Sequence, residues 1–190
     1  MKKTVLLCAA FILLCGLLGC GGKKGAEGGQ EASAYGDPLE VLNAVVASYE
    51  ADDLFAMYGG NQKQAVMDAP GKFDIAETEE LELNLGMPKE QLSDIEDAAS
   101  MVHMMNANTF TGACYQLKEG ADIDGLAKAA VSQIKETQWI CGQPDTVVTI
   151  QVGGSYLITA FGNAELIEQF KNNAVSALEG AKVIQEESIA

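Results

Sequence analysis

Three side chains that can bind soft metal ions recur at alternate positions of one short segment: Met101, His103 and Met105. Thioether sulfur and imidazole nitrogen both suit Cu(I). Alternate residues of a strand lie on one face, so a strand over 99–105 would present the three together. The alternative is a methionine-packed sheet core around a hydrogen-bonded histidine. We expect no dedicated metal site and keep these residues as weak candidates for copper handling.

An acidic run over 74–82 is a second group with chemical potential, since it contains Glu77, Glu79, Glu80 and Glu82. Paired carboxylates catalyse glycoside hydrolysis. Carboxylates in an acidic chain more often form a solvated face, and no aromatic sugar-binding pattern surrounds this run. A hydrolase that uses carboxylates is therefore kept as an alternative, and no catalytic residue is assigned.

Other catalytic and metal-binding motifs are absent or incomplete. His103 is the single histidine, and no nucleophile motif of the G-x-S-x-G type accompanies it. Asp122-Ile123-Asp124-Gly125 resembles the start of a calcium loop, but an EF-hand requires a glutamate where Gln133 stands. We interpret Asp122 or Asp124 as a helix cap, and we expect no cofactor.

Cys114 and Cys141 are an even pair in the part of the chain after residue 20. In an exported domain such a pair is compatible with a disulfide. Cysteine is also among the most buried residue types, so two free thiols are the alternative. Cys114 falls on an expected strand and Cys141 on the buried stripe of the following helix. Both are expected to face one core layer, which leaves the two interpretations open.

The N-terminus has the pattern of an export signal. Lys2 and Lys3 precede an apolar run over 5–18, which is shorter than the ~20 residues that cross a bilayer. The run closes on Leu17-Leu18-Gly19-Cys20, which resembles the lipobox of bacterial lipoproteins. That resemblance implies cleavage after residue 19 and acylation of Cys20, which stably anchors a protein when two or more chains insert. We expect a signal peptide over 1–19.

The expected mature chain begins with a glycine-rich segment. Residues 20–36 contain few large apolar side chains, so we expect a flexible tether there and a single domain over 37–190. The net charge of the whole chain is −15, which argues against nucleic acid as a partner. The chain contains no arginine, which excludes bidentate arginine clamps on phosphate or carboxylate.

Hydrophobic periodicity and turn residues predict the elements of that domain. A helix starts after Asp37 and runs to about Leu54. Strands follow over 99–105 and 110–117, then a helix over 121–141, a hairpin of strands over 146–152 and 156–161, and a helix from Asn163 to Leu178. The order β-β-α-β-β-α after an N-terminal helix predicts an α+β fold: an antiparallel sheet with helices packed on one face.

The pattern FTGACYQLKEGADIDGLAKAAVSQIKETQW…TVVTIQVGGSYLITAFGNAELIEQF, together with the lipobox and the glycine-rich segment, resembles an uncharacterised family of clostridial lipoproteins. The resemblance covers roughly residues 80–180. It implies a Gram-positive host and an outward-facing anchor, and it assigns no catalytic residue.

These observations together predict a non-enzymatic binding or interaction module, held by lipid on Cys20 at the extracytoplasmic face of the cell membrane. A surface protein or a cell-wall component is the expected partner. The alternatives are the carboxylate hydrolase of the cell envelope and copper handling through Met101, His103 and Met105.

Overall fold

An eight-stranded antiparallel sheet forms the centre of the protein. The structure is a computed structural model, which describes residues 34–140 and 142–189. The strands follow the spatial order β2-β1-β4-β5-β7-β6-β8, and β3 also pairs with β4. Their bounds are β1 Met57–Gly59, β2 Val66–Met67, β3 Gly71–Phe73, β4 Ile95–His103, β5 Phe110–Leu117, β6 Thr146–Val152, β7 Tyr156–Gly162 and β8 Ala181–Ser188.

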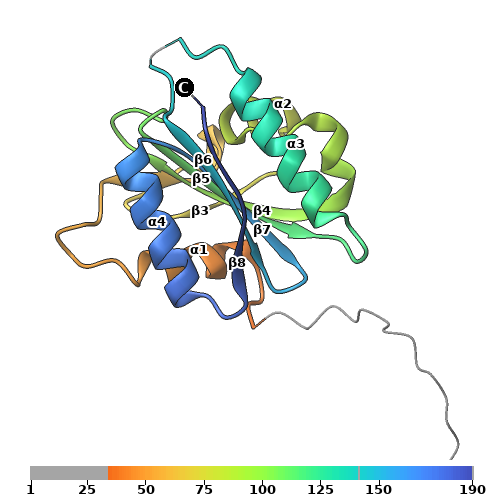
Figure 1. Cartoon of the computed structure of the whole chain (residues 1–190), viewed down its shortest axis with the longest axis horizontal. Coiled ribbons are helices and arrows are strands. Elements are labelled where there is room, and N and C mark those ends of the chain that lie inside the picture. The colour runs from red at the N-terminus through yellow and green to blue at the C-terminus, as the bar shows by residue number, and fades with distance from the viewer. Residues whose placement is uncertain (1–33, 141, 190) are drawn as a thin grey trace, which may run out of the picture.

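Helices cover both faces of this sheet (Figure 1). Helices α1 (Pro38–Val46) and α4 (Ala164–Ala177) pack on one face, and α2 (Thr78–Leu85) and α3 (Ile123–Glu136) pack on the other. Two short 3-10 helices, η1 (Gln62–Gln64) and η2 (Lys89–Asp94), flank α2 in the chain. Each face of the sheet therefore has its own apolar core.

The predicted α+β class with an antiparallel sheet is confirmed. The expectation that the helices pack on one face is wrong, and the central strands explain why. Along β5, Cys114 faces the α1–α4 core while Ala113 and Tyr115 face the α2–α3 core. Strands that are apolar on both faces need cover on both.

Several elements occupy the expected residues. Strands β5 and β6 match their predicted ranges. Asp122 caps α3, because its Oδ1 accepts the Gly125 N–H at 3.1 Å, and Asn163 caps α4 in the same way. These features depend on residues close together in the chain, so they can be predicted from the sequence alone.

Other elements differ. The first helix ends at Val46 and not near Leu54, and the long helix ends at Glu136. The final strand β8 was not predicted, because it is an edge strand with only partly buried side chains and a weak apolar alternation. Strands β1 to β3 are two or three residues long, which is too short to show the alternation of apolar and polar residues that predicts a strand.

Among the described residues, Tyr35, two residues before the expected boundary, already contacts the domain. Its backbone carbonyl accepts the Tyr156 hydroxyl at 2.9 Å, and its own hydroxyl accepts the Glu179 N–H at 3.2 Å. The expected signal peptide, Cys20 and most of the expected tether lie outside the described residues. Within the part of the chain that is described, no helix is long and apolar enough to span a membrane.

Candidate functional site

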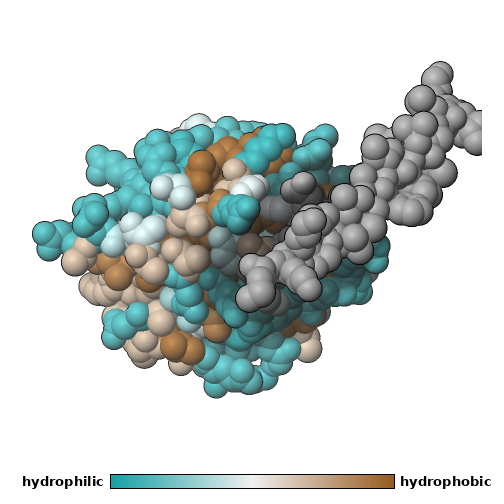
Figure 2. All heavy atoms as spheres, turned by 90° about the horizontal axis from the view of Figure 1, so that it is seen from below, coloured by the Kyte–Doolittle hydropathy of each residue, from teal (hydrophilic) through white to brown (hydrophobic). Residues whose placement is uncertain are grey.

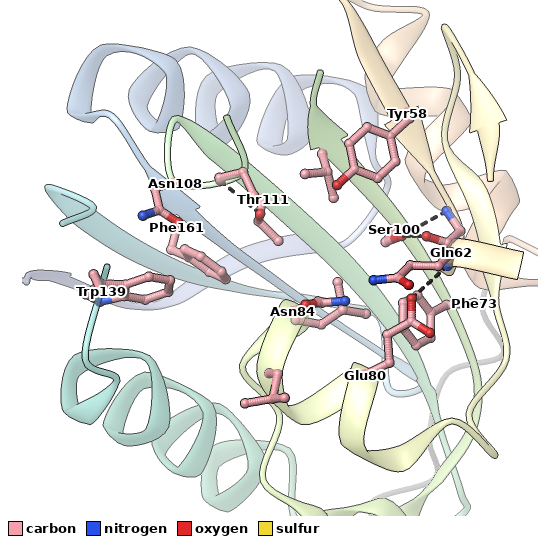
Figure 3. A pocket seen from close by; sticks show the side chains of 15 residues that line it. Tyr58, Gln62, Phe73, Glu80, Asn84, Ser100, Asn108, Thr111, Trp139 and Phe161 are labelled. Atoms are coloured by element: carbon pink, nitrogen blue, oxygen red, sulfur yellow. Dashed lines mark hydrogen bonds between the residues drawn. The ribbon is translucent and has the colours of Figure 1, made fainter. Parts of the chain in front are cut away.

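A pocket of about 210 Å³ lies on the α2–α3 side of the sheet (Figure 3). Its apolar surface comes from β3, β4, β7, α2 and the segment after α3, through Phe73, Leu83, Leu85, Val102, Trp139 and Phe161. Its polar surface comes mainly from Tyr58, Gln62, Glu80, Asn84, Asn108 and Thr111. The lining is thus about equally polar and apolar, and a cavity that combines apolar surface with convergent polar groups can bind a small molecule.

One end of the pocket is acidic. Glu80 Oε1 accepts the Gln62 N–H at 2.7 Å, which ties α2 to the loop after β1. Tyr58 is half-buried at the same end, and burial, with the Glu80 charge as the second cause, raises the pKa of its hydroxyl. The phenol therefore stays protonated at neutral pH and can both donate and accept a hydrogen bond.

A tight crossing of β1 and β3 positions Tyr58. Both strands pair with the same edge of β4, and glycines allow them to meet there. A Cβ on Gly59 would lie 2.0 Å from Gly71 N. Gly60 has φ +83, and its N–H donates to the buried Ser100 Oγ at 3.0 Å. Only glycine fits this close approach without displacement of the backbone.

Helix α2 positions Glu80. Leu81 and Leu85 anchor the helix in the core, and it stops at Gly86, which has φ 71 and so provides the left-handed cap that glycine favours. Glu80 and Asn84 are four residues apart, so they lie on one face of the helix. Figure 3 shows Asn84 between the acidic end and the opposite end of the pocket.

The opposite end is aromatic. The rings of Trp139 and Phe161 have centroids 5.4 Å apart at an interplanar angle of 44°. Trp139 Nε1 is shielded from solvent and has no hydrogen-bond partner within the described structure. Two exposed apolar side chains, Leu83 and Ile140, stand near this region, Leu83 as part of the lining and Ile140 next to Trp139 in the chain.

The acidic run over 74–82 divides between two roles. Glu77 pairs with Lys63, and Glu82 pairs with Lys89 at 3.2 Å. Asp74 accepts the Ala76 N–H at 3.0 Å. Glu80 is the one carboxylate of the described pocket lining. Most of this run is thus a solvated face, and a single member faces the cavity.

Met101, His103 and Met105 do not lie together on one strand face. Strand β4 ends at His103, so Met105 falls beyond it and is 84% exposed, whereas Met101 is buried in the α1–α4 core. His103 stacks on Phe55 with ring centroids 5.3 Å apart, and its Nδ1 accepts the Met105 N–H at 3.2 Å. Among the described residues, no group of three His, Cys, Asp or Glu side chains could hold a metal ion.

Cys114 is a free, fully buried thiol of the α1–α4 core. Burial raises the pKa of this thiol well above its ordinary value. The expectation that Cys114 faces the same core layer as α3 is wrong, because α3 packs on the other side of the sheet. Cys141 lies outside the described residues, so its pairing with Cys114 stays a prediction.

The pocket was not predicted from the sequence. Acidic residues at the start of α2 and the glycine after it are signals that could have indicated a helix over 78–85. Such a helix would have placed Glu80 and Asn84 on one face. No local signal links them to Tyr58 or Trp139, which come from distant segments.

A scan against protein-family models, a search of curated proteins and a search of solved structures each found no match to this chain. The pocket geometry and the sequence are therefore the basis for the function proposed below.

Proposed function

We propose that this protein is a non-enzymatic binding protein of the cell envelope, lipid-anchored through Cys20 at the extracytoplasmic face, which takes a small ligand in the pocket between α2 and the sheet. The observation that carries the binding role is the pocket itself. Its lining combines apolar side chains with several polar ones, as ligand sites do. The lipobox resemblance and the apolar run before it support the location.

The pocket favours binding over carboxylate catalysis. Glycoside hydrolysis requires two carboxyl groups that flank the bond to be cleaved. Of the side chains that line the described pocket, Glu80 is the single carboxylate. The copper alternative gains no support either, since Met101 is buried in the opposite core.

The binding role is tested by a thermal-shift screen of the purified full-length chain against metals, cell-wall fragments, peptides and common metabolites. A ligand at 100 times its dissociation constant adds about 2.7 kcal/mol of stability. The Asn84→Phe variant, which places a larger side chain in the lining between the two ends of the pocket, is expected to abolish the shift. Glu79→Phe is the matched control, because residue 79 is exposed on the same helix and does not line the pocket. A shift that survives Asn84→Phe would contradict the role of the pocket.

The anchor is tested separately in cells. The wild-type chain is expected to sediment with membranes, and the Cys20→Ala variant is expected to appear in the soluble fraction after export. Exported Cys20→Ala protein that still sediments with membranes would contradict lipid anchoring at this residue.

A further inference from the structure

The two ends of the pocket differ in chemistry, and the difference specifies a class of ligand. Glu80 and Tyr58 stand at one end, and Trp139 and Phe161 stand at the other (Figure 3). We propose that the ligand is a small amine whose ammonium group binds Glu80 and whose apolar body lies against Trp139 and Phe161. This inference rests on the proposed binding function and names its ligand.

Charge at the acidic end supports a cation. Within the described lining no lysine faces Glu80. The pKa of Lys63 is raised mainly by its hydrogen bond to Glu77 and only to a lesser extent by the Glu80 charge, and its side chain is 73% exposed. The Gln62 N–H occupies one oxygen of Glu80, and a carboxylate has further acceptor positions. An ammonium group would donate a charge-assisted hydrogen bond to these acceptor positions of Glu80.

The charge of the whole chain also favours a cationic ligand. A net charge of −15 attracts small cations to the surface and repels anions. On the face shown in Figure 2, hydrophilic residues surround a band of more hydrophobic ones. A carboxylate or phosphate ligand would meet no arginine anywhere in the chain and no lysine in the described lining.

The size and the aromatic end limit the rest of the ligand. A volume of about 210 Å³ is small for a ligand site, which suits a compact ligand. Trp139 and Phe161 offer ring faces on which a flat apolar group can pack. A primary amine joined to one aromatic or branched aliphatic group satisfies both ends. Its source is either a free amine or the N-terminus of a peptide, because both present an ammonium beside an apolar group.

Trp139 is the single tryptophan of the chain, so intrinsic fluorescence reports directly on this pocket. Four probes are titrated into the full-length chain: phenethylamine, 2-phenylethanol, phenylacetate and ethylammonium. Phenethylamine is expected to change Trp139 fluorescence with saturation, and the other three are expected to bind at least tenfold more weakly. Phenylalanine amide imitates a peptide N-terminus. Comparison of its affinity with that of phenethylamine distinguishes a peptide N-terminus from a free amine as the source.

Glu80→Gln tests the charge directly. Glutamine keeps an oxygen that can accept the Gln62 N–H, so the loop contact survives while the negative charge is removed. Affinity for phenethylamine is expected to fall about ten- to a hundredfold, and affinity for 2-phenylethanol is expected to stay within about twofold of the wild-type value. Glu79→Gln makes the same charge change outside the pocket and should leave both affinities unchanged.

Equal affinity for the amine and the alcohol, or amine binding that Glu80→Gln does not weaken, would overturn the amine assignment and leave the binding pocket in place. Absence of phenethylamine binding would overturn the assignment as well. The binding function itself fails only if no ligand of the screen is sensitive to Asn84→Phe. Circular dichroism of each variant verifies that the fold is retained.

Discussion

Lys72 of β3 forms an ion pair with Asp37, the N-cap residue of α1, with Nζ 3.3 Å from Asp37 Oδ2. The same ammonium also pairs with Asp97 of β4. Asp37 additionally accepts the Glu40 N–H at 2.8 Å. A short strand, a helix start and a central strand thus meet at one lysine.

Removal of the Asp37 charge is expected to destabilise the protein in a pH-dependent way. Burial would raise the pKa of Asp37, but the hydrogen bonds from Glu40 and Lys72 outweigh it and hold the pKa below the ordinary 3.8. A lowered folded-state pKa stabilises the protein above pH 3.8, and this contribution disappears as the pH falls through the folded-state value. Asp37→Asn, which keeps a capping side chain, should lose about 0.5–1 kcal/mol at neutral pH.

Urea denaturation of wild type and Asp37→Asn at neutral pH and below pH 3.8 measures this difference. Asp52→Asn is the control, because Asp52 is exposed and its replacement removes the same charge. An Asp37→Asn deficit that is equally large at both pH values would contradict the ion pair as its cause.

Gly60→Ala is expected to destabilise the protein more than Gly120→Ala does. The two glycines have nearly equal φ values, +83 and +82, so alanine incurs the same left-handed strain at both, about 1–2 kcal/mol. At Gly60 the added Cβ would also lie 2.8 Å from Lys72 O, whereas at Gly120 nothing lies within 4 Å. The difference between their unfolding free energies isolates the close approach of Gly60, the residue after β1, to the carbonyls of Lys72 and Gln64. Equal losses would show that this close approach tolerates a side chain.

Stability is expected to fall in alkaline solution between pH 10 and about 12. Burial first, and then nearby negative charges, raise the pKa of Tyr156 to about 12, while an unfolded tyrosine ionises near 10. A raised folded-state pKa contributes stability below pH 10, which is lost as the pH rises toward the folded-state value. Tyr156→Phe should show a smaller alkaline loss, and it should cost about 1 kcal/mol at neutral pH through the lost bond to the Tyr35 carbonyl. An unchanged alkaline slope in this variant would contradict the assignment.

Cys114 is expected to resist iodoacetamide in the folded chain and to react after unfolding without reductant. Its thiol is fully buried, and its raised pKa leaves little reactive thiolate. Peptide mass spectrometry measures the modification. Rapid labelling of the folded chain would contradict the burial. Failure to label after unfolding would instead indicate the Cys114–Cys141 disulfide, which reduction would then release.

The parts of the fold that were predicted correctly depend on local chemistry. Asp122 and Asn163 cap their helices through backbone groups two or three residues away. Gly153 lies at the hairpin between β6 and β7 with φ +56, in the left-handed region that favours glycine. Each of these signals acts within a single turn, so no knowledge of distant segments is needed.

The features of the fold that were not predicted depend on which face of the sheet each neighbouring element covers. Cys114 and Tyr115 are both apolar and both buried, yet they belong to different cores. The apolar residues on both faces of β5 indicate that both faces need cover, but they do not indicate which helix covers which face. Edge strand β8 is only partly buried, so it has little of the alternation by which strands are predicted.

By itself, the sequence determined the class of fold, the helix caps and the expectation of an exported, lipid-anchored chain. Tertiary structure alone decided which helices cover which face and that Met101 and Met105 lie apart. It also decided that Glu80, alone among the acids of 74–82, faces a cavity. The physical reason is that Tyr58, Glu80 and Trp139 come from a strand, a helix and a post-helix segment. Only the packing of these elements on one sheet brings them to the same pocket.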